Sequence, residues 1–198
     1  MHLLYLHGFN SSPQSHKAVQ TREWLARHHP DVAFECPLLS PYPEEAMATL
    51  EAIGAARVGA DTLVAGSSMG GFYATWVSQT FACKGVLINP AVRPWRGREY
   101  LLGRQKNFHS GEEYLFEQRH IDAFVRWEID PLPVPQNLWV LLQSGDEVLD
   151  YRHALDKYRD CRLTVEEGGD HAFQGFERFL PNIFCWAWPG SGTTSDYE

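Results

Sequence analysis

The most informative segment of the sequence is Gly66-Ser67-Ser68-Met69-Gly70-Gly71, which follows the short apolar run 63–65 and leads into a helical pattern over 70–80. It matches the pattern G-x-S-x-G, with Ser68 at its centre. In that pattern a strand turns into a helix so tightly that the positions two before and two after the central serine have no room for a side chain. The turn lifts the hydroxyl off the sheet, so we predict that Ser68 is a nucleophile.

Two other interpretations of this stretch compete with that prediction. A Gly- and Ser-rich turn between a strand and a helix would have a similar composition, and so short a pattern also occurs by chance. The position between a strand and a helix favours the nucleophile. Ser67 is the competing hydroxyl, but its spacing to the glycines is wrong by one residue, so Ser68 is preferred.

Short apolar runs alternate with longer amphipathic runs on both sides of this turn. The expected strands are 3–6, 32–36, 63–65, 85–88, 138–142 and 162–166. The expected helices are 15–28, 44–57, 70–80, 152–158 and 173–186. Such alternation predicts an α/β fold of about six mostly parallel strands with helices on both faces. Active sites in such sheets lie beyond the carboxyl ends of the strands, so catalytic residues are expected directly after strands.

The alternation stops at Arg93 and resumes after Pro135. The segment 93–135 has no strand-like run, so we predict a mainly helical, cap-like insertion. Its aromatic side chains could line an acyl pocket beneath a lid, or they could pack the insertion onto the sheet. Packing is preferred, because aromatic residues in helices are more often part of a core. These residues include Trp95, Tyr114, Phe116, Phe124 and Trp127.

His171 is the expected base for Ser68. A serine hydroxyl needs an adjacent base, and histidine suits the task because its pKa lies near neutral pH. His171 follows the last predicted strand. In folds that carry the G-x-S-x-G turn, the catalytic histidine comes last in the chain, after that strand. The other histidines fit structural or surface roles better.

Asp146 is expected to orient that base. It follows the predicted strand 138–142, and its carboxylate would accept a hydrogen bond from Nδ1–H of His171. Glu147 is the first alternative and Asp150 the second. Asp170 is a poorer candidate, because neighbouring side chains in an extended loop diverge.

Two backbone amides are expected to bind the oxyanion that forms during the reaction. The Met69 N–H lies at the predicted start of a helix, where backbone amides favour negative charge. The Phe9 N–H follows the first predicted strand, within His7-Gly8-Phe9-Asn10. His7 is expected to have a structural role and no part in proton transfer.

Composition narrows the classes of function. The chain has 198 residues, 44% of them apolar and 21% charged, which predicts one domain over 1–188 with a flexible tail over 189–198. A net charge of −8 with no basic block argues against nucleic acid. No signal peptide or membrane span is visible, and four dispersed cysteines favour a reducing cytoplasm. Neither a metal nor a phosphate-binding motif is present, so no metal or cofactor is expected.

Several stretches together resemble the YqiA-like small esterases of the α/β-hydrolase superfamily. They are Leu-His-Gly-Phe-Asn-Ser-Ser-Pro (6–13), Gly-Ser-Ser-Met-Gly-Gly-Phe-Tyr-Ala (66–74), Ile-Asn-Pro-Ala-Val-Arg-Pro (88–94), Gln-Ser-Gly-Asp-Glu-Val-Leu-Asp-Tyr (143–151) and Gly-Gly-Asp-His-Ala-Phe (168–173). The resemblance runs from residue 2 to about residue 186. It implies a compact α/β-hydrolase that lacks the first two strands of the larger fold, and a bacterial cytoplasmic esterase or thioesterase. It also implies the same nucleophile, acid and base, namely Ser68, Asp146 and His171.

The expected function is therefore hydrolysis of a small or medium acyl ester or thioester, through an acyl-enzyme on Ser68. The partner would be a small-molecule substrate. Two alternatives stay open: a non-catalytic binding module on the same fold, and a hydrolase of another bond, such as an amide or a C–C bond. All three triad residues are present, which argues against the binding module.

Overall fold

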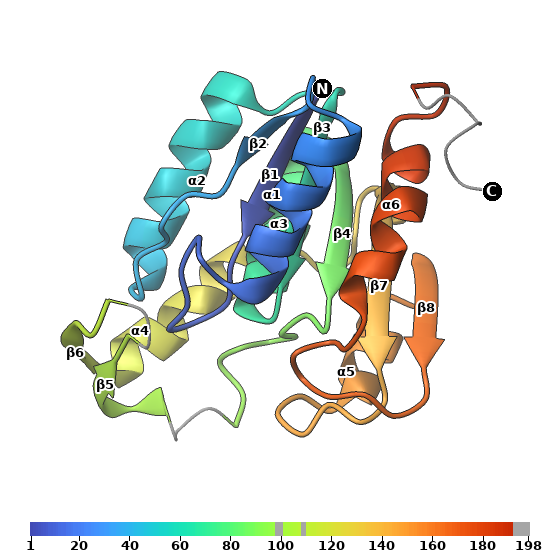
Figure 1. Ribbon diagram of the computed structural model, residues 1–198. Helices are drawn as coiled ribbons and strands as arrows, with labels where there is room; N and C mark the ends of the chain where they lie inside the picture. Colours follow the sequence, from blue (N-terminus) through green and yellow to red (C-terminus); the bar gives the residue numbers. More distant parts are fainter. Residues whose placement is uncertain (98–100, 108–109, 192–198) are drawn as a thin grey trace.

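Six parallel strands form the central sheet of the computed structural model, which describes residues 1–97, 101–107 and 110–191 (Figure 1). The strands of this sheet are β1 (His2–Leu6), β2 (Ala33–Glu35), β3 (Thr62–Ser67), β4 (Lys84–Ile88), β7 (Leu138–Gln143) and β8 (Arg162–Glu166). They lie in the order β2-β1-β3-β4-β7-β8, and each is parallel to its neighbours. The predicted fold of about six mostly parallel strands is confirmed.

Helices cover both faces of the sheet (Figure 1). Along β1, Leu3 and Tyr5 belong to one buried cluster and Leu4 and Leu6 to the other, because successive side chains of a strand point to opposite faces. The first cluster includes residues of α1 (His16–His28) and α6 (Leu180–Ala187). The second includes residues of α2 (Pro43–Arg57), α3 (Met69–Phe81) and α5 (Tyr151–Lys157). No helix in the described part of the chain is long and apolar enough to cross a membrane.

The chain reverses its direction across the sheet between β1 and β3. After β1 it moves outward to β2, then returns to β3 on the other side of β1 and continues towards β8. In open parallel sheets, ligands bind beyond the carboxyl ends of the strands at such a reversal. Phe9 follows β1 and Ser68 follows β3, so the topology places these two predicted site residues at the reversal.

The insertion between β4 and β7 is not mainly helical, and this part of the prediction was wrong. It contains an antiparallel hairpin of β5 (Gly103–Lys106) and β6 (Glu113–Phe116). The short helix α4 (Gln118–Ala123) and the 3-10 turns η2 (Phe124–Trp127) and η3 (Pro135–Asn137) follow. β5 was missed because Gly-Arg-Gln-Lys has none of the β-branched or aromatic residues typical of strands. Residues 98–100 and 108–109 of the insertion lie outside the described residues.

The aromatic side chains of the insertion pack against the body of the protein. Phe124 lies edge-on to Phe72 of α3, with 5.7 Å between ring centroids, and Trp95 lies edge-on to the same ring at 6.4 Å. Phe116 is buried in the α2–α3 side of the core, and Tyr114 and Trp127 are partly buried against it. These contacts agree with the packing interpretation of the aromatic residues.

The last helix is shorter than the predicted 173–186. Phe173 has a left-handed backbone (φ 57°), and a 3-10 turn, η4 (Phe176–Phe179), precedes α6. Helix α6 begins at Leu180 with Pro181 in its first turn, where the missing N–H of proline costs no helical hydrogen bond. Residues 192–198 of the predicted tail lie outside the described residues.

Candidate active site

The turn between β3 and α3 has the geometry that the G-x-S-x-G pattern predicts. Ser68 has φ 55° and ψ −123°, which is a strained conformation for any residue with a side chain. A Cβ atom on Gly66 would lie 2.1 Å from the carbonyl oxygen of Gly70, and one on Gly70 would lie 1.9 Å from that of Leu6. Both positions therefore exclude a side chain.

Three side chains from three loops meet beyond the carboxyl ends of the strands. His171 Nε2 lies 3.0 Å from Ser68 Oγ. On the other side of the ring, His171 Nδ1 lies 2.8 Å from Asp146 Oδ2 and 3.0 Å from Oδ1. The structure thus brings together the predicted nucleophile, base and acid, in the connectivity that a serine nucleophile requires.

Asp146 lies in an environment that keeps it ionised. Burial opposes ionisation, but hydrogen bonds from His171 and from the backbone amides of Leu149 and Val148 outweigh that effect, so the pKa of the Asp146 carboxyl lies below its ordinary value. The side chain is only 2% exposed, against 23% for His171. An ionised Asp146 holds the proton of the neutral imidazole on Nδ1 and leaves Nε2 free to accept the proton of Ser68.

The alternative carboxylates have other partners. Glu147 accepts a hydrogen bond from the backbone N–H of His171 at 3.0 Å and so supports the loop. Asp150 accepts from the backbone N–H of Arg152 at 3.0 Å and caps α5. The Asp170 carboxylate accepts from the Gln174 side chain at 2.8 Å. The alternative hydroxyl, Ser67, is the last residue of β3.

Two buried amide side chains hold the loops of this site, and sequence reasoning missed both. Asn89 donates to the carbonyls of Asp170 and His171 at 3.0 and 3.4 Å, and its Oδ1 accepts from the backbone N–H of Gln143. Gln143 Oε1 accepts from the backbone amides of Asp170 and Gln174. Both residues directly follow or end a buried strand, and this position was the only signal that could have indicated their role.

The two predicted oxyanion donors belong to one cavity of about 300 Å³. Ser68 and His171 line the same cavity, as do Leu101 and Gln105 of the insertion. Met69 is the first residue of α3, and the first amides of a helix have no partner within it. The Met69 amide therefore has no partner within α3, at the edge of this cavity.

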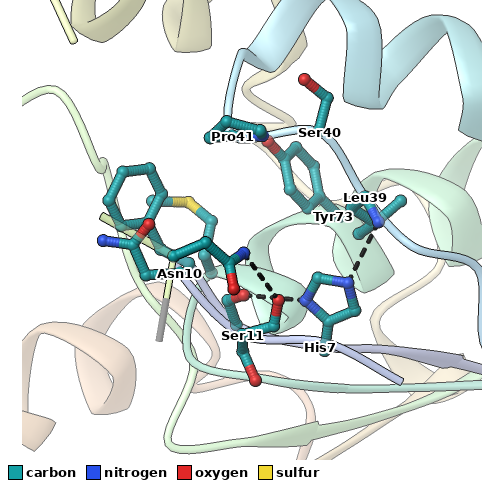
Figure 2. A pocket seen from close by; sticks show the side chains of 11 residues that line it. His7, Asn10, Ser11, Leu39, Ser40, Pro41 and Tyr73 are labelled. Atoms are coloured by element: carbon teal, nitrogen blue, oxygen red, sulfur yellow. Dashed lines mark hydrogen bonds between the residues drawn. The ribbon is translucent and has the colours of Figure 1, made fainter. Parts of the chain in front are cut away.

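His7 fixes the orientation of the peptide that carries the Phe9 amide, and Figure 2 shows its ring hydrogen-bonded to Leu39. Its Nε2 accepts a hydrogen bond from Leu39 N–H at 3.0 Å, so a neutral ring carries its proton on Nδ1. Nδ1 in turn lies 2.9 Å from the Gly8 carbonyl oxygen. The Gly8 carbonyl and the Phe9 N–H belong to one trans peptide and point in opposite directions. With the carbonyl directed at His7, the Phe9 N–H points away from it.

Among the described residues, no group of three or more His, Cys, Asp or Glu side chains lies where it could hold a metal ion. The four cysteines are free thiols, and burial raises the pKa of Cys36, Cys83 and Cys161 to about 12. A thiol with so high a pKa is almost wholly protonated at neutral pH and is a poor nucleophile.

Comparison with known proteins agrees with this fold over nearly the whole chain. The model of an uncharacterised protein family, UPF0227, matches residues 2–187. The chain belongs to the UPF0227 family. The resemblance to YqiA-like proteins that the sequence motifs predicted is thus confirmed at the level of the family. A UPF0227 protein of Yersinia pseudotuberculosis serotype O:1b is 27% identical over 187 residues, which are 91% of this chain and 96% of that protein.

Two solved structures have a fold similar to that of this UPF0227 protein. Mouse alpha/beta hydrolase domain-containing protein 10 matches with a TM-score of 0.68 at 16% identity, over 93% of this chain and 87% of that one. Est1E from Butyrivibrio proteoclasticus, with ferulic acid bound, matches with a TM-score of 0.68 at 12% identity, over 92% and 86% of the two chains. At such identities these matches establish the α/β-hydrolase fold alone.

Proposed function

We propose that this UPF0227 protein is a serine hydrolase that cleaves a small or medium acyl ester or thioester. The observation that carries the proposal is the chain of contacts from Ser68 Oγ to His171 Nε2 at 3.0 Å, and from His171 Nδ1 to Asp146 Oδ2 at 2.8 Å. Each element of acyl-transfer chemistry has a candidate: an activated hydroxyl, an oriented base and two backbone amides beside the same cavity.

In the first half of the reaction, Ser68 Oγ attacks the carbonyl carbon of the substrate and His171 Nε2 takes the hydroxyl proton. A bond forms between Oγ and carbon, and the carbonyl oxygen becomes an oxyanion that the Phe9 and Met69 amides bind. The tetrahedral intermediate then expels the alcohol or thiol, which receives the proton from His171. The acyl group stays on Ser68.

The second half of the reaction repeats these steps with water. His171 takes a proton from a water molecule as its oxygen attacks the acyl carbon, and the oxyanion forms again between the same two amides. Collapse of this intermediate breaks the bond to Ser68 Oγ, and His171 returns its proton to that oxygen. The carboxylic acid leaves, and ionised Asp146 stabilises the imidazolium in both halves.

The cavity and the thiols support this choice of chemistry and substrate. A volume of about 300 Å³ lies at the lower end of ligand pockets, which favours a short acyl group. The likeness to Est1E, with its bound ferulic acid, supports a substrate that releases a carboxylic acid. High thiol pKa values leave Ser68 as the better nucleophile. Four free thiols also suit the reducing cytoplasm that we propose as its location.

The proposal is tested by labelling with a fluorophosphonate, which reacts with activated serines. We expect one label per molecule in the native protein and none in Ser68→Ala. Ser67→Ala is the matched control, because it removes a neighbouring hydroxyl from the same turn and should label fully. Labelling that survives in Ser68→Ala and disappears in Ser67→Ala would move the nucleophile by one residue.

Turnover of an ester, a thioester and an amide with matched acyl groups separates the remaining alternatives. We expect the ester and thioester to react, because a triad without a dedicated amine-binding pocket cleaves these bonds more readily than amides. Folded protein that neither labels nor hydrolyses any of them would make the binding module the better account. Faster turnover of the amide than of the ester and thioester would show that the protein is an amide hydrolase.

A further inference from the structure

The hairpin of the insertion is hydrogen-bonded to the loop that follows β1. Tyr114 of β6 donates its hydroxyl proton to Asn10 Oδ1. The other side of the same amide, Asn10 Nδ2, lies 3.4 Å from Gln105 Oε1 on β5. Further along, Asn107 Nδ2 donates to the backbone carbonyl of Ser11 at 3.3 Å. Both strands of the hairpin, and Asn107 directly after β5, therefore contact a loop about 95 to 104 residues earlier in the chain.

The same hairpin also packs against the side chain of Phe9. The Phe9 ring lies edge-on to Phe116 with 5.2 Å between centroids, and edge-on to Tyr114 with 6.3 Å. Such edge-to-face pairs are attractive beyond the apolar area that they bury. Strand β6 thus contacts Phe9 through ring packing and Asn10 through a hydrogen bond.

Asn10 has a backbone conformation that depends on support. Its φ is 55°, in the left-handed region, and its side chain is buried. Asparagine enters this region more readily than most residues, but still at some cost. Hydrogen bonds at both ends of its side-chain amide therefore fix a turn that the backbone alone would not favour.

The hairpin and His7 hold the Phe9 amide from opposite directions along the chain. His7 directs the Gly8 carbonyl, and with it the peptide of the Phe9 N–H. The hairpin fixes the next two points, the Phe9 ring and the Asn10 turn. A backbone N–H that is already held in place does not have to move when negative charge develops on the substrate oxygen. It therefore stabilises the oxyanion at no cost in reorganisation.

We propose that Tyr114 is a positioning residue for the oxyanion donor at Phe9, acting through Asn10. This inference rests on the proposed hydrolase function. It assigns the hairpin a part in catalysis as a fixed support for the oxyanion loop. Burial, with a smaller opposing effect of the Asn10 hydrogen bond, raises the pKa of Tyr114 to about 12, so the hydroxyl keeps the proton that it donates throughout the neutral range.

The test compares Tyr114→Phe with Tyr42→Phe on a short-chain ester. Tyr42 is a suitable control because its ring packs edge-on against Tyr114 at 5.8 Å and it belongs to the same aromatic cluster, so the substitution removes a hydroxyl from the same surroundings. We expect kcat to fall about tenfold in Tyr114→Phe with KM changed less than about twofold, because the oxyanion exists only in the transition state and small misplacements are costly. Tyr42→Phe should keep the native kcat.

A second variant, Asn10→Gly, tests the route through Asn10. Glycine accepts the left-handed backbone, so this substitution removes the side chain without straining the turn. The kcat of the double variant Tyr114→Phe/Asn10→Gly should be no lower than that of the slower single variant. The reason is that both changes break the same hydrogen bond between Tyr114 and Asn10. Should Tyr114→Phe fail to fold by circular dichroism, Asn10→Gly alone must show the selective loss in kcat.

The outcomes distinguish this inference from the function on which it rests. A native protein that hydrolyses no ester overturns both. A native protein that turns over ester while Tyr114→Phe and Asn10→Gly match its kcat overturns the positioning role alone. Losses that multiply in the double variant, or that appear in KM instead of kcat, would also overturn it.

Discussion

The two halves of the candidate site are supported in different ways. The acid–base half consists of the loops after β7 and β8, and the buried amides of Asn89 and Gln143 tie these loops to the ends of the strands. The proposed oxyanion half has Met69 at the start of α3 and Phe9 in the loop after β1, and the partners of that loop lie outside the sheet. His7 contacts the segment at Leu39, while Tyr114 of the insertion contacts Asn10.

This difference has consequences for substitutions in each half. Strand ends belong to the part of the protein that unfolds cooperatively, so their buried polar contacts contribute to global stability. The hairpin of the insertion is a separate two-stranded sheet, and the hydroxyl contact of Tyr114 can be lost at less cost to the whole protein, because its ring still packs against Phe9 and Phe116. Changes in the acid–base half should therefore alter stability together with activity, and changes at the hairpin should alter mainly activity.

The largest effect is expected from Asp146→Asn in the acid–base half. An asparagine keeps the size of the side chain but no longer holds the proton of His171 on Nδ1, so the base presents the wrong tautomer to Ser68. We expect kcat for a short-chain ester to fall about 10⁴-fold, by analogy with the same change in other serine triads. Steady-state kinetics with enzyme freed of native contamination would measure it.

Asp150→Asn is the control for that prediction. Asp150 caps α5 by accepting the Arg152 N–H, and asparagine caps a helix as well as aspartate does. We expect native kinetics and stability from this variant. A large loss in Asp150→Asn with near-native Asp146→Asn would instead make Asp150 the acid.

A smaller effect on rate, joined by a loss of stability, is expected from Gln143→Leu. The leucine removes the buried side-chain oxygen that accepts from the backbone amides of Asp170 and Gln174. We expect the free energy of unfolding in urea to fall by about 3 kcal/mol, since each unpaired buried group costs about 1–3 kcal/mol. The kcat should fall as well, because the loop that carries His171 loses its support.

The matched change is Gln174→Ala, which removes an exposed amide from the same loop. It should alter the free energy of unfolding by no more than about 0.5 kcal/mol. Equal stability losses in the two variants would show that the buried amide of Gln143 is not what holds the loop. A loss of stability in Tyr114→Phe as large as that in Gln143→Leu would remove the difference between the two halves.

The sequence predicted those parts of the fold whose determinants are local. The spacing of Gly66 and Gly70 around Ser68 predicted a turn that excludes side chains, and the clearances at both positions confirm it. Asp146 and His171 could be chosen because parallel strands bring their following loops to one edge of the sheet. The six strands of the central sheet were predicted to within one or two residues at their ends.

The features that the sequence did not predict depend on contacts that the local residue pattern does not indicate. β5 is a strand because it pairs with β6, and nothing in Gly103–Lys106 indicates that pairing. Asn89 and Gln143 hold the His171 loop through contacts that span 27 to 82 residues, which no local pattern records. The start of α6 is the exception, because Pro181 is a local signal for the beginning of a helix.

The smallest expected effect is the pH dependence of the Asp146 contribution. The folded-state pKa of Asp146 lies below its ordinary value of 3.8, so its ionised form stabilises the protein above that pH. This contribution is lost as the pH falls through the lowered folded-state pKa. The difference in melting temperature between the native protein and Asp146→Asn should therefore narrow below a pH of about 3.8. Thermal unfolding of the two proteins at a series of pH values measures it. If the gap stayed as wide in acid as at neutral pH, the difference between the variants would come from packing, and the ionised Asp146 would not stabilise the acid–base half.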